Sequence, residues 1–189
     1  MNLNIAQKML AMGIAVLIGL LAMGLIINRI DANVNAAIST NEMRIQQLDI
    51  ITSVQDAQLR LLLAAMDSIV DKDEGRIDAE RRQTINDSAQ VISSSLGKLV
   101  ELADTAEEKR LVQQLQSAAN KLIDGVKGDL FSLIEQKLPA GTATEADFEH
   151  IDDVLDRNGN TVEEALIGLK TSVKQEVTEA NIELHSTVD

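Results

Sequence analysis

The 189-residue sequence contains no cysteine, which excludes a disulfide framework, a cysteine-containing zinc site and a Cys-x-x-Cys-His haem attachment. Its aromatic residues are two phenylalanines, with no tryptophan and no tyrosine. Base-stacking platforms and aromatic cages for quaternary amines are therefore not expected. The core has to be built from aliphatic side chains.

Basic residues are also scarce, since 17 lysines and arginines face 30 aspartates and glutamates, for a formal net charge of −13. Lys8 and Arg29 are the only charged residues before Asp31, so almost all of the acidic excess falls on the rest of the chain. Such a surface repels phosphate backbones and offers no basic stripe. A nucleic-acid partner is excluded.

Patterns that carry catalysis or bind cofactors are missing too. The sequence shows no Ser/His/Asp group, no glycine-rich phosphate loop and no paired catalytic carboxylates. The two histidines, His150 and His185, fall on one predicted helix about 50 Å apart, too far to share a metal ion. We expect no enzymatic activity, no cofactor and no metal site in this chain.

A long apolar run stands at the start of the sequence. Residues 9–27 read MLAMGIAVLIGLLAMGLII, without a charge, which is long enough to cross a hydrocarbon core of about 30 Å. A cleaved signal peptide is the alternative, but its apolar stretch is shorter and ends in a small-residue cleavage site. We predict a cytoplasmic tail at residues 1–8 and a transmembrane helix at 9–29, with the orientation favoured by the positive-inside rule. Ala11, Ala15 and Gly19 form a small-xxx-small stripe typical of packed membrane helices.

After this run, a seven-residue repeat of apolar side chains predicts a helix over residues 30–71, continuous with the anchor. One repeat position holds Ile38, Ile45, Leu59 and Met66, and the other holds Leu48, Leu62 and Ile69. Thr52 and Gln55 occupy the same two positions between apolar layers. They are expected to form a polar layer in the core that sets register, or to contact a ligand.

Three further amphipathic stretches predict helices at residues 77–103, 106–137 and 145–187. Thr105 and Glu108 have the spacing of a capping box, and the last helix begins after Thr142 or Thr144. Residues 156–160 resemble the start of a calcium loop, but their glycine is misplaced, so a local helix irregularity is expected there. The predicted fold is all-α, an antiparallel up-down-up-down four-helix bundle at residues 30–189. Because the fourth helix returns to the membrane, a second span and a cytoplasmic signalling region are expected beyond the sequence.

This order of elements resembles the N-terminal part of bacterial methyl-accepting chemotaxis proteins. Residues 60–75 and 102–110 are similar to segments common in their four-helix-bundle sensors. The resemblance implies a homodimer in the inner membrane, with the sensor in the periplasm or outside the cell. It implies a small-molecule ligand and a displacement of the fourth helix. A histidine kinase and a coupling protein would be reached only through the missing cytoplasmic region.

The resemblance does not fix the type of protein to which the sensor belongs. Histidine kinases and diguanylate cyclases carry the same type of sensor, and a membrane-anchored structural or adaptor protein would show the same repeats.

Arg60 is the candidate ligand-binding charge, because related aspartate-type receptors use arginines on this helix to hold a carboxylate. Those receptors use several arginines, whereas Arg60 has Leu59 and Leu61 beside it. A solvated or ion-paired Arg60 is the alternative. We expect a small hydrophilic ligand, anions included, at the dimer-facing distal part of the first helix, closed by the fourth helix of either subunit.

Overall fold

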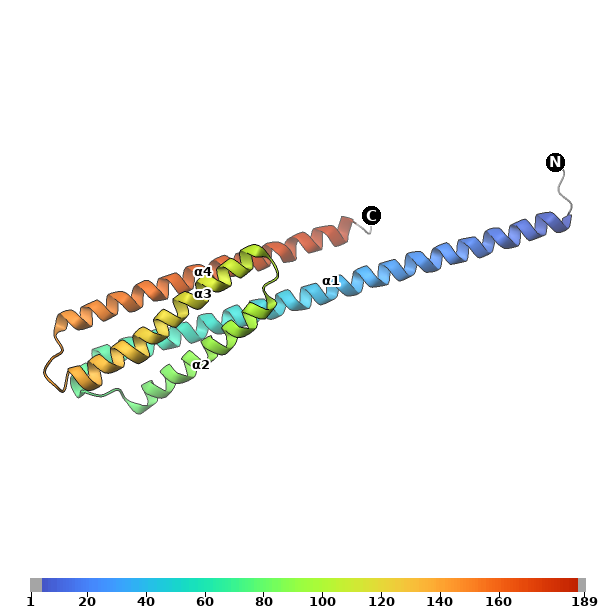
Figure 1. Ribbon diagram of the computed structural model, residues 1–189. Coiled ribbons are helices and arrows are strands. Elements are labelled where there is room, and N and C mark those ends of the chain that lie inside the picture. The colour runs from blue at the N-terminus through green and yellow to red at the C-terminus, as the bar shows by residue number, and fades with distance from the viewer. Residues whose placement is uncertain (1–4, 187–189) are drawn as a thin grey trace.

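The computed structural model describes the backbone of residues 5–186 and the side chains of Met23, residues 38–180 and Ile182. Every regular element in this part of the chain is helical. The four α-helices are α1 (Ile5–Val70), α2 (Ala79–Leu102), α3 (Ala106–Asp124) and α4 (Glu145–Ser186). They lie along a common axis and alternate in direction, and α1 extends far beyond the bundle (Figure 1). The prediction of an all-α helical bundle is confirmed.

Shorter helical elements complete the connections. The 3-10 turn η1 (Lys72–Glu74) follows α1, and two π-helical segments, η2 (Gly125–Leu130) and η3 (Leu133–Lys137), prolong α3. Within the bundle, α1 packs mainly against α2 and α4, while α3 packs mainly against α4. The turn after α1 and the turn before α4 lie at one end, which we call the distal end. The α2–α3 turn and the exit of α1 lie at the other, the proximal end (Figure 1).

Local chemistry at the distal turn explains the first reversal. Gly75 adopts φ 66°, a left-handed conformation that costs glycine little, and its N–H donates to Lys72 O at 2.8 Å. Asp78 then caps α2, because its carboxylate accepts from Glu80 N at 2.8 Å.

The other two helix starts use threonine caps. Thr105 Oγ1 accepts from Glu108 N at 3.1 Å, whereas the Glu108 carboxylate reaches back to Asp104 N rather than to Thr105. Thr144 directly precedes α4 and caps it, since its N–H donates to the Asp147 carboxylate at 2.8 Å and its hydroxyl accepts from Asp147 N at 3.3 Å. The predicted cap spacing holds at both sites, and of the two candidates for the last helix Thr144 is the cap.

The core is aliphatic. On α2, α3 and α4 the apolar residues that repeat every three or four positions are buried, as predicted. On α2 the predicted stripe is buried throughout, as it is on α3 and its π-helical extension and on α4 from Phe148 to Val173. On α1 the prediction is wrong for the first repeat position, whose residues are exposed: Ile38, Ile45, Leu59 and Met66. Those at the second position are half-buried: Leu48, Leu62 and Ile69.

A second stripe with the same spacing faces the core instead. Its members are buried: Arg44, Gln47, Ile51, Val54, Gln58, Leu61, Ala65 and Ser68. Thr52 and Gln55 are consequently exposed and form no polar layer in the core of this bundle. The helix carries two parallel heptad stripes, and the one with larger apolar residues lies on the surface.

The predicted irregularity at residues 156–160 is also wrong, because α4 passes through them as regular α-helix. Gly159 lies there against α1, and a Cβ at this position would stand 3.0 Å from Leu62 Cδ1. Gln58 Nε2 donates to Gly159 O at 2.8 Å. The glycine therefore permits a close approach of two helices, and the irregular helix in the described chain is α3.

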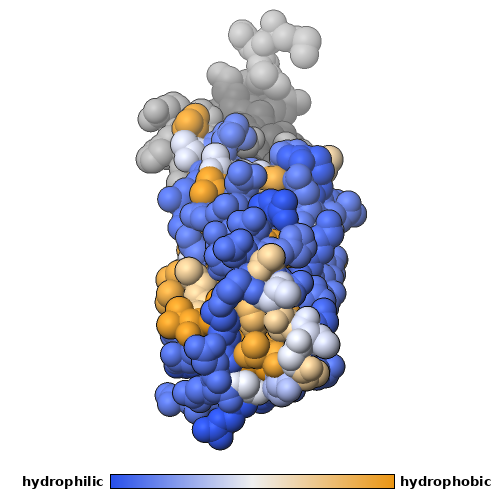
Figure 2. Space-filling model, turned by 90° about the vertical axis from the view of Figure 1, so that its left-hand side faces the viewer, coloured by the Kyte–Doolittle hydropathy of each residue, from blue (hydrophilic) through white to orange (hydrophobic). Residues whose placement is uncertain are grey.

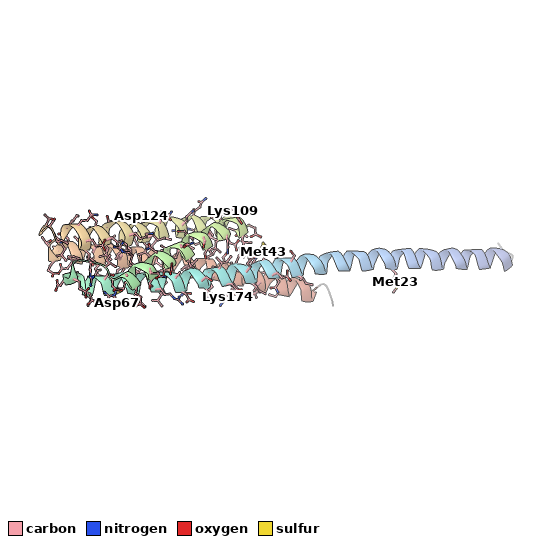
Figure 3. The ribbon with its side chains drawn as sticks, turned by 90° about the horizontal axis from the view of Figure 1, so that it is seen from below. Met23, Met43, Asp67, Lys109, Asp124 and Lys174 are labelled. Atoms are coloured by element: carbon pink, nitrogen blue, oxygen red, sulfur yellow. The ribbon has the colours of Figure 1, made fainter. Side chains whose placement is uncertain are left out.

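At the proximal end α1 leaves the bundle near Met43, and Met23 lies on its free part (Figure 3). Among the residues described with their side chains, no helix is both long and apolar enough to cross a membrane. The predicted span at residues 9–29, with Ala11, Ala15 and Gly19, lies outside them except for Met23. Viewed from the distal end, the surface is largely hydrophilic with separate hydrophobic patches (Figure 2).

Candidate functional site

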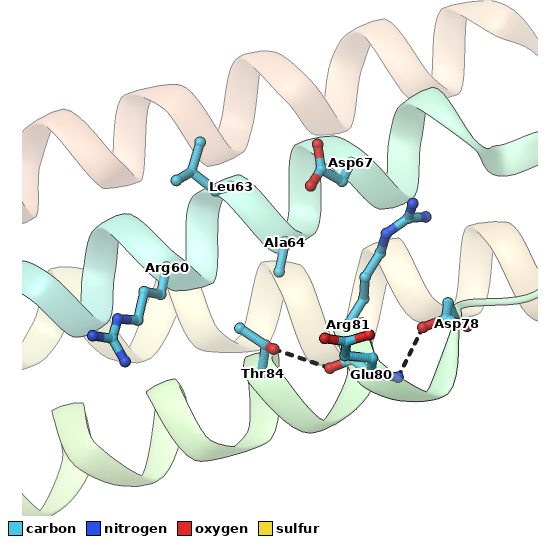
Figure 4. Close-up of a pocket in the computed structure, with 8 residues that line it drawn as sticks. All are labelled: Arg60, Leu63, Ala64, Asp67, Asp78, Glu80, Arg81 and Thr84. Carbon is cyan, nitrogen blue, oxygen red and sulfur yellow. Dashed lines mark hydrogen bonds between the residues drawn. The ribbon is translucent and has the colours of Figure 1, made fainter.

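A shallow groove of about 440 Å³ runs between α1 and α2 in the distal half of the bundle. Figure 4 shows that Arg60 reaches into it from α1, and that Thr84 and Glu80 face it from α2. The lining residues are Arg60, Leu63, Ala64, Asp67, Asp78, Glu80, Arg81 and Thr84. The groove therefore combines two apolar side chains, Leu63 and Ala64, with charges of both signs.

The charged residues of the groove differ in their hydrogen-bond and ion-pair partners. Arg81 forms an ion pair with Asp71, which ties α2 to the end of α1. The backbone N–H of Glu80 lowers the pKa of Asp78 below its ordinary value of 3.8, so this carboxylate is occupied as a helix cap. Arg60 is exposed and makes no hydrogen bond or ion pair with the residues described here. Its five N–H donors are available to a ligand.

The predicted binding residues are not brought together. Arg60 lines the groove, whereas Gln55 lies about one and a half turns and Thr52 about two turns away along α1, both outside the groove lining. The Thr52 hydroxyl donates to Leu48 O at 2.9 Å within its own helix. Within the chain the groove beside Arg60 is lined from α1, from α2 and from the residue that caps α2, and no residue of α4 lines it. The expectation that α4 of either subunit closes the site stays a prediction.

A second polar site lies at the proximal end, where Arg44 is 5% exposed and Glu108 is fully buried. Arg44 Nη2 donates to both carboxylate oxygens of Asp104, at 3.0 and 2.9 Å. Arg44 Nη1 donates to Gln47 Oε1 at 2.9 Å and to Glu108 Oε1 at 3.3 Å. Glu176 of α4 completes the group through an ion pair with Arg44. We call Arg44, Asp104, Glu108 and Glu176 the proximal cluster.

The cluster is braced by its neighbours. Gln47 Nε2 donates to Leu102 O at 2.9 Å, at the last residue of α2. Oxygens of Asp104, Glu108 and Glu176 lie within 4.8 Å of one another, a spacing that could suit a cation. Arg44 already contacts all three carboxyl groups, so we assign the arrangement as an ion-pair network and not as a metal site.

Two carboxyl groups of the cluster are perturbed in opposite directions. Burial raises the pKa of Glu176 above its ordinary value of 4.5, with the nearby Glu108 adding to the effect and Arg44 only partly offsetting it. Burial also acts to raise the pKa of Asp104, but the hydrogen bond from Arg44 leads the opposing effects, which prevail. The pKa of Asp104 therefore lies below 3.8.

The proximal cluster was not predicted, although the sequence carries one signal of it. Arg44, Gln47 and Gln58 continue the spacing of the buried α1 stripe, alternating three and four residues with Ile51, Val54 and Leu61. A polar residue inside such a stripe indicates a buried partner. The partners themselves are 60, 64 and 132 residues away from Arg44, and nothing in the sequence pairs them.

Comparison with known proteins adds no neighbour: no family model, no curated protein and no solved structure matches this chain.

Proposed function

We propose that this chain is the sensor portion of a membrane-anchored receptor, which detects a small polar ligand at the distal end and relays the signal along α1 and α4. The observation that carries the proposal is the shape of the bundle. Its two longest helices, α1 and α4, both run past α2 and α3 at the proximal end (Figure 1). With about 1.5 Å per residue, α1 is about 100 Å long, so it can transmit a displacement over that distance.

The apolar run at residues 9–27 supports a membrane anchor at the far end of α1. The acidic bundle then lies outside the cytoplasm, as the positive-inside rule favours. The resemblance to chemotaxis receptors supports a relay to a cytoplasmic module that controls a histidine kinase.

The exposed stripe of α1 supports a homodimer. Leu59 is 58% exposed and Ile38 is 52% exposed, and together with Ile45 and Met66 they follow a coiled-coil spacing. Large apolar side chains at regular intervals along one helix face are costly to leave in water, whereas a second copy would bury them. Thr52 and Gln55 would then form a polar layer between subunits, where they can fix the register of the two α1 helices.

The groove at Arg60 supports the ligand site. An unpaired guanidinium can hold a carboxylate or another planar anion through two parallel hydrogen bonds. Asp67 and Glu80 add negative charge to the same groove, so a purely anionic ligand loses part of this gain. The geometry thus favours a small polar molecule with an anionic group placed at Arg60.

Ligand binding should be measured by a thermal-shift screen of organic acids, amino acids and inorganic anions on the full chain in detergent. A ligand at a hundred times its Kd should stabilise the folded state by about 2.7 kcal/mol. Arg60→Ala should abolish the shift. Arg110→Ala, which removes an exposed arginine paired with Glu107 on α3, should leave the shift intact. A shift that survives Arg60→Ala would contradict the assignment of this groove as the ligand site.

A further inference from the structure

The proximal cluster connects α1 to three other parts of the bundle through the Arg44 side chain. Arg44 belongs to α1, Asp104 to the α2–α3 turn, Glu108 to the first turn of α3 and Glu176 to α4. Arg44 follows Met43, which lies where α1 leaves the bundle (Figure 3). A movement of α4 relative to α1 would change the contact between Arg44 and Glu176. The cluster therefore lies at the end of the bundle that faces the proposed membrane anchor.

The charges in the cluster do not balance. Three carboxyl groups share one guanidinium, and Glu179 adds a fourth acidic group on the same stretch of α4. Lys109 lies nearby, but its Nζ donates to the backbone oxygen of Asp104 at 3.2 Å and not to a carboxylate. Like charges at such short distances in a partly buried site repel strongly. One proton on one carboxyl group would relieve this repulsion.

Glu176 is the group that can take up this proton. Glu108 is fully buried, whereas the Glu176 side chain is 22% exposed. It lines an opening of about 230 Å³ between α1 and α4, together with Asn41, Arg44, Val177, Glu179 and Ala180. Water can reach Glu176 through this opening.

We propose that the proximal cluster is a proton-controlled latch, in which protonation of Glu176 tightens the contact between α4 and α1 and deprotonation loosens it. This makes the membrane-facing end of the bundle responsive to pH in addition to any ligand at the distal groove. The latch depends only on the contacts within the bundle, so it stands whether or not the groove binds a ligand.

The direction of the pH effect follows from the linkage between the protonation of Glu176 and the stability of the folded chain. Because the pKa of Glu176 is raised in the folded chain, its protonated form is favoured there. The stability that this group contributes is fully present below 4.5 and is lost as the pH rises through its raised pKa. Asp104 acts in the opposite sense, since its contribution is present above 3.8 and is lost as the pH falls further. Acidification therefore first tightens the latch and loosens it only in strong acid.

Amide hydrogen exchange on the full chain in detergent tests the latch. Protection of peptides covering residues 170–182 should increase as the pH is lowered from about 7.5 to 4.5, after correction for intrinsic exchange rates. The increase should be about tenfold for each unit by which the pKa of Glu176 is raised. Peptides in the middle of α2 serve as an internal reference for global stability.

Two matched variants identify the group responsible. Glu176→Gln should keep residues 170–182 protected at neutral pH and remove their pH response. Glu179→Gln makes the same charge change three residues away, where the carboxylate accepts from Gln175 and not from Arg44. This variant should retain most of the response, because Glu179 acts on Glu176 less than Glu108, Arg44 and Asp104 do. The proposal is overturned if the wild-type chain shows no pH response, if Glu176→Gln responds like the wild type, or if Glu179→Gln loses the response equally.

Discussion

Replacing Arg44 by methionine removes the cation that three carboxyl groups share while keeping a side chain of similar length. Asp104, Glu108 and Glu176 would then face one another without compensation, and Glu108 has no access to water. Leaving one partner of a buried ion pair alone costs about 3–5 kcal/mol. We expect Arg44→Met to lower the free energy of unfolding by this amount at neutral pH.

Arg60→Met is the matched control, because it makes the same substitution on the same helix at an exposed site without an ion pair. Surface substitutions of this kind usually change stability by about 0.5 kcal/mol or less. Thermal unfolding of the full chain, followed by circular dichroism, should separate the two variants. At about 2–4 °C per kcal/mol for a domain of this size, Arg44→Met should lower Tm by roughly 6–20 °C.

The cost of Arg44→Met should also shrink in acid, as protonation removes the carboxylate charges that the arginine neutralises. If Arg44→Met unfolds at the same temperature as Arg60→Met, the proximal cluster does not stabilise the bundle and this reasoning is refuted.

Two further predictions concern α1 and its neighbours. Since the chain has no cysteine, Leu59→Cys should form a disulfide only between two copies; crosslinking under mild oxidation is expected there and not at Val91→Cys, an exposed apolar position on α2. A monomer at Leu59→Cys would contradict the α1 dimer. Gly97→Ala should raise the free energy of unfolding by about 1 kcal/mol in a urea titration, because no atom lies within 4 Å of the added Cβ. Gly159→Ala should fail to show this gain, since its Cβ meets Leu62 and disturbs the Gln58 bond. Equal gains at both glycines would show that α1 and α4 are not in close contact.

Much of the fold could be predicted from local signals. The caps at Thr105 and Thr144 and the spacing of aliphatic residues identified the helices and, for three of them, the buried face. These signals depend on neighbouring residues in the sequence, so they can be seen without the structure.

The buried face of α1 could not be predicted in the same way, because two stripes with the same period compete on that helix. The exposed stripe has the larger apolar residues, whereas the buried stripe includes Arg44, Gln47 and Gln58, whose partners come from distant segments. A prediction based on hydrophobicity alone therefore took the exposed stripe for the buried one. The proximal cluster was missed for the same reason, since its charges meet only after four helices have packed.

The structure joins α1 to α4 by two polar contacts at different heights, the Gln58 bond to Gly159 and the Arg44 ion pair with Glu176. Fourteen residues separate Gln58 from Arg44, which places the two contacts about 20 Å apart along α1. Apolar contacts have no direction and tolerate small slides, but a hydrogen bond is satisfied only over a narrow range of positions. With both contacts in place, α4 is held in one register, and a slide of one helical turn breaks both of them together. We therefore expect α4 to move along α1 in steps of a helical turn, because intermediate positions would leave both contacts unmade.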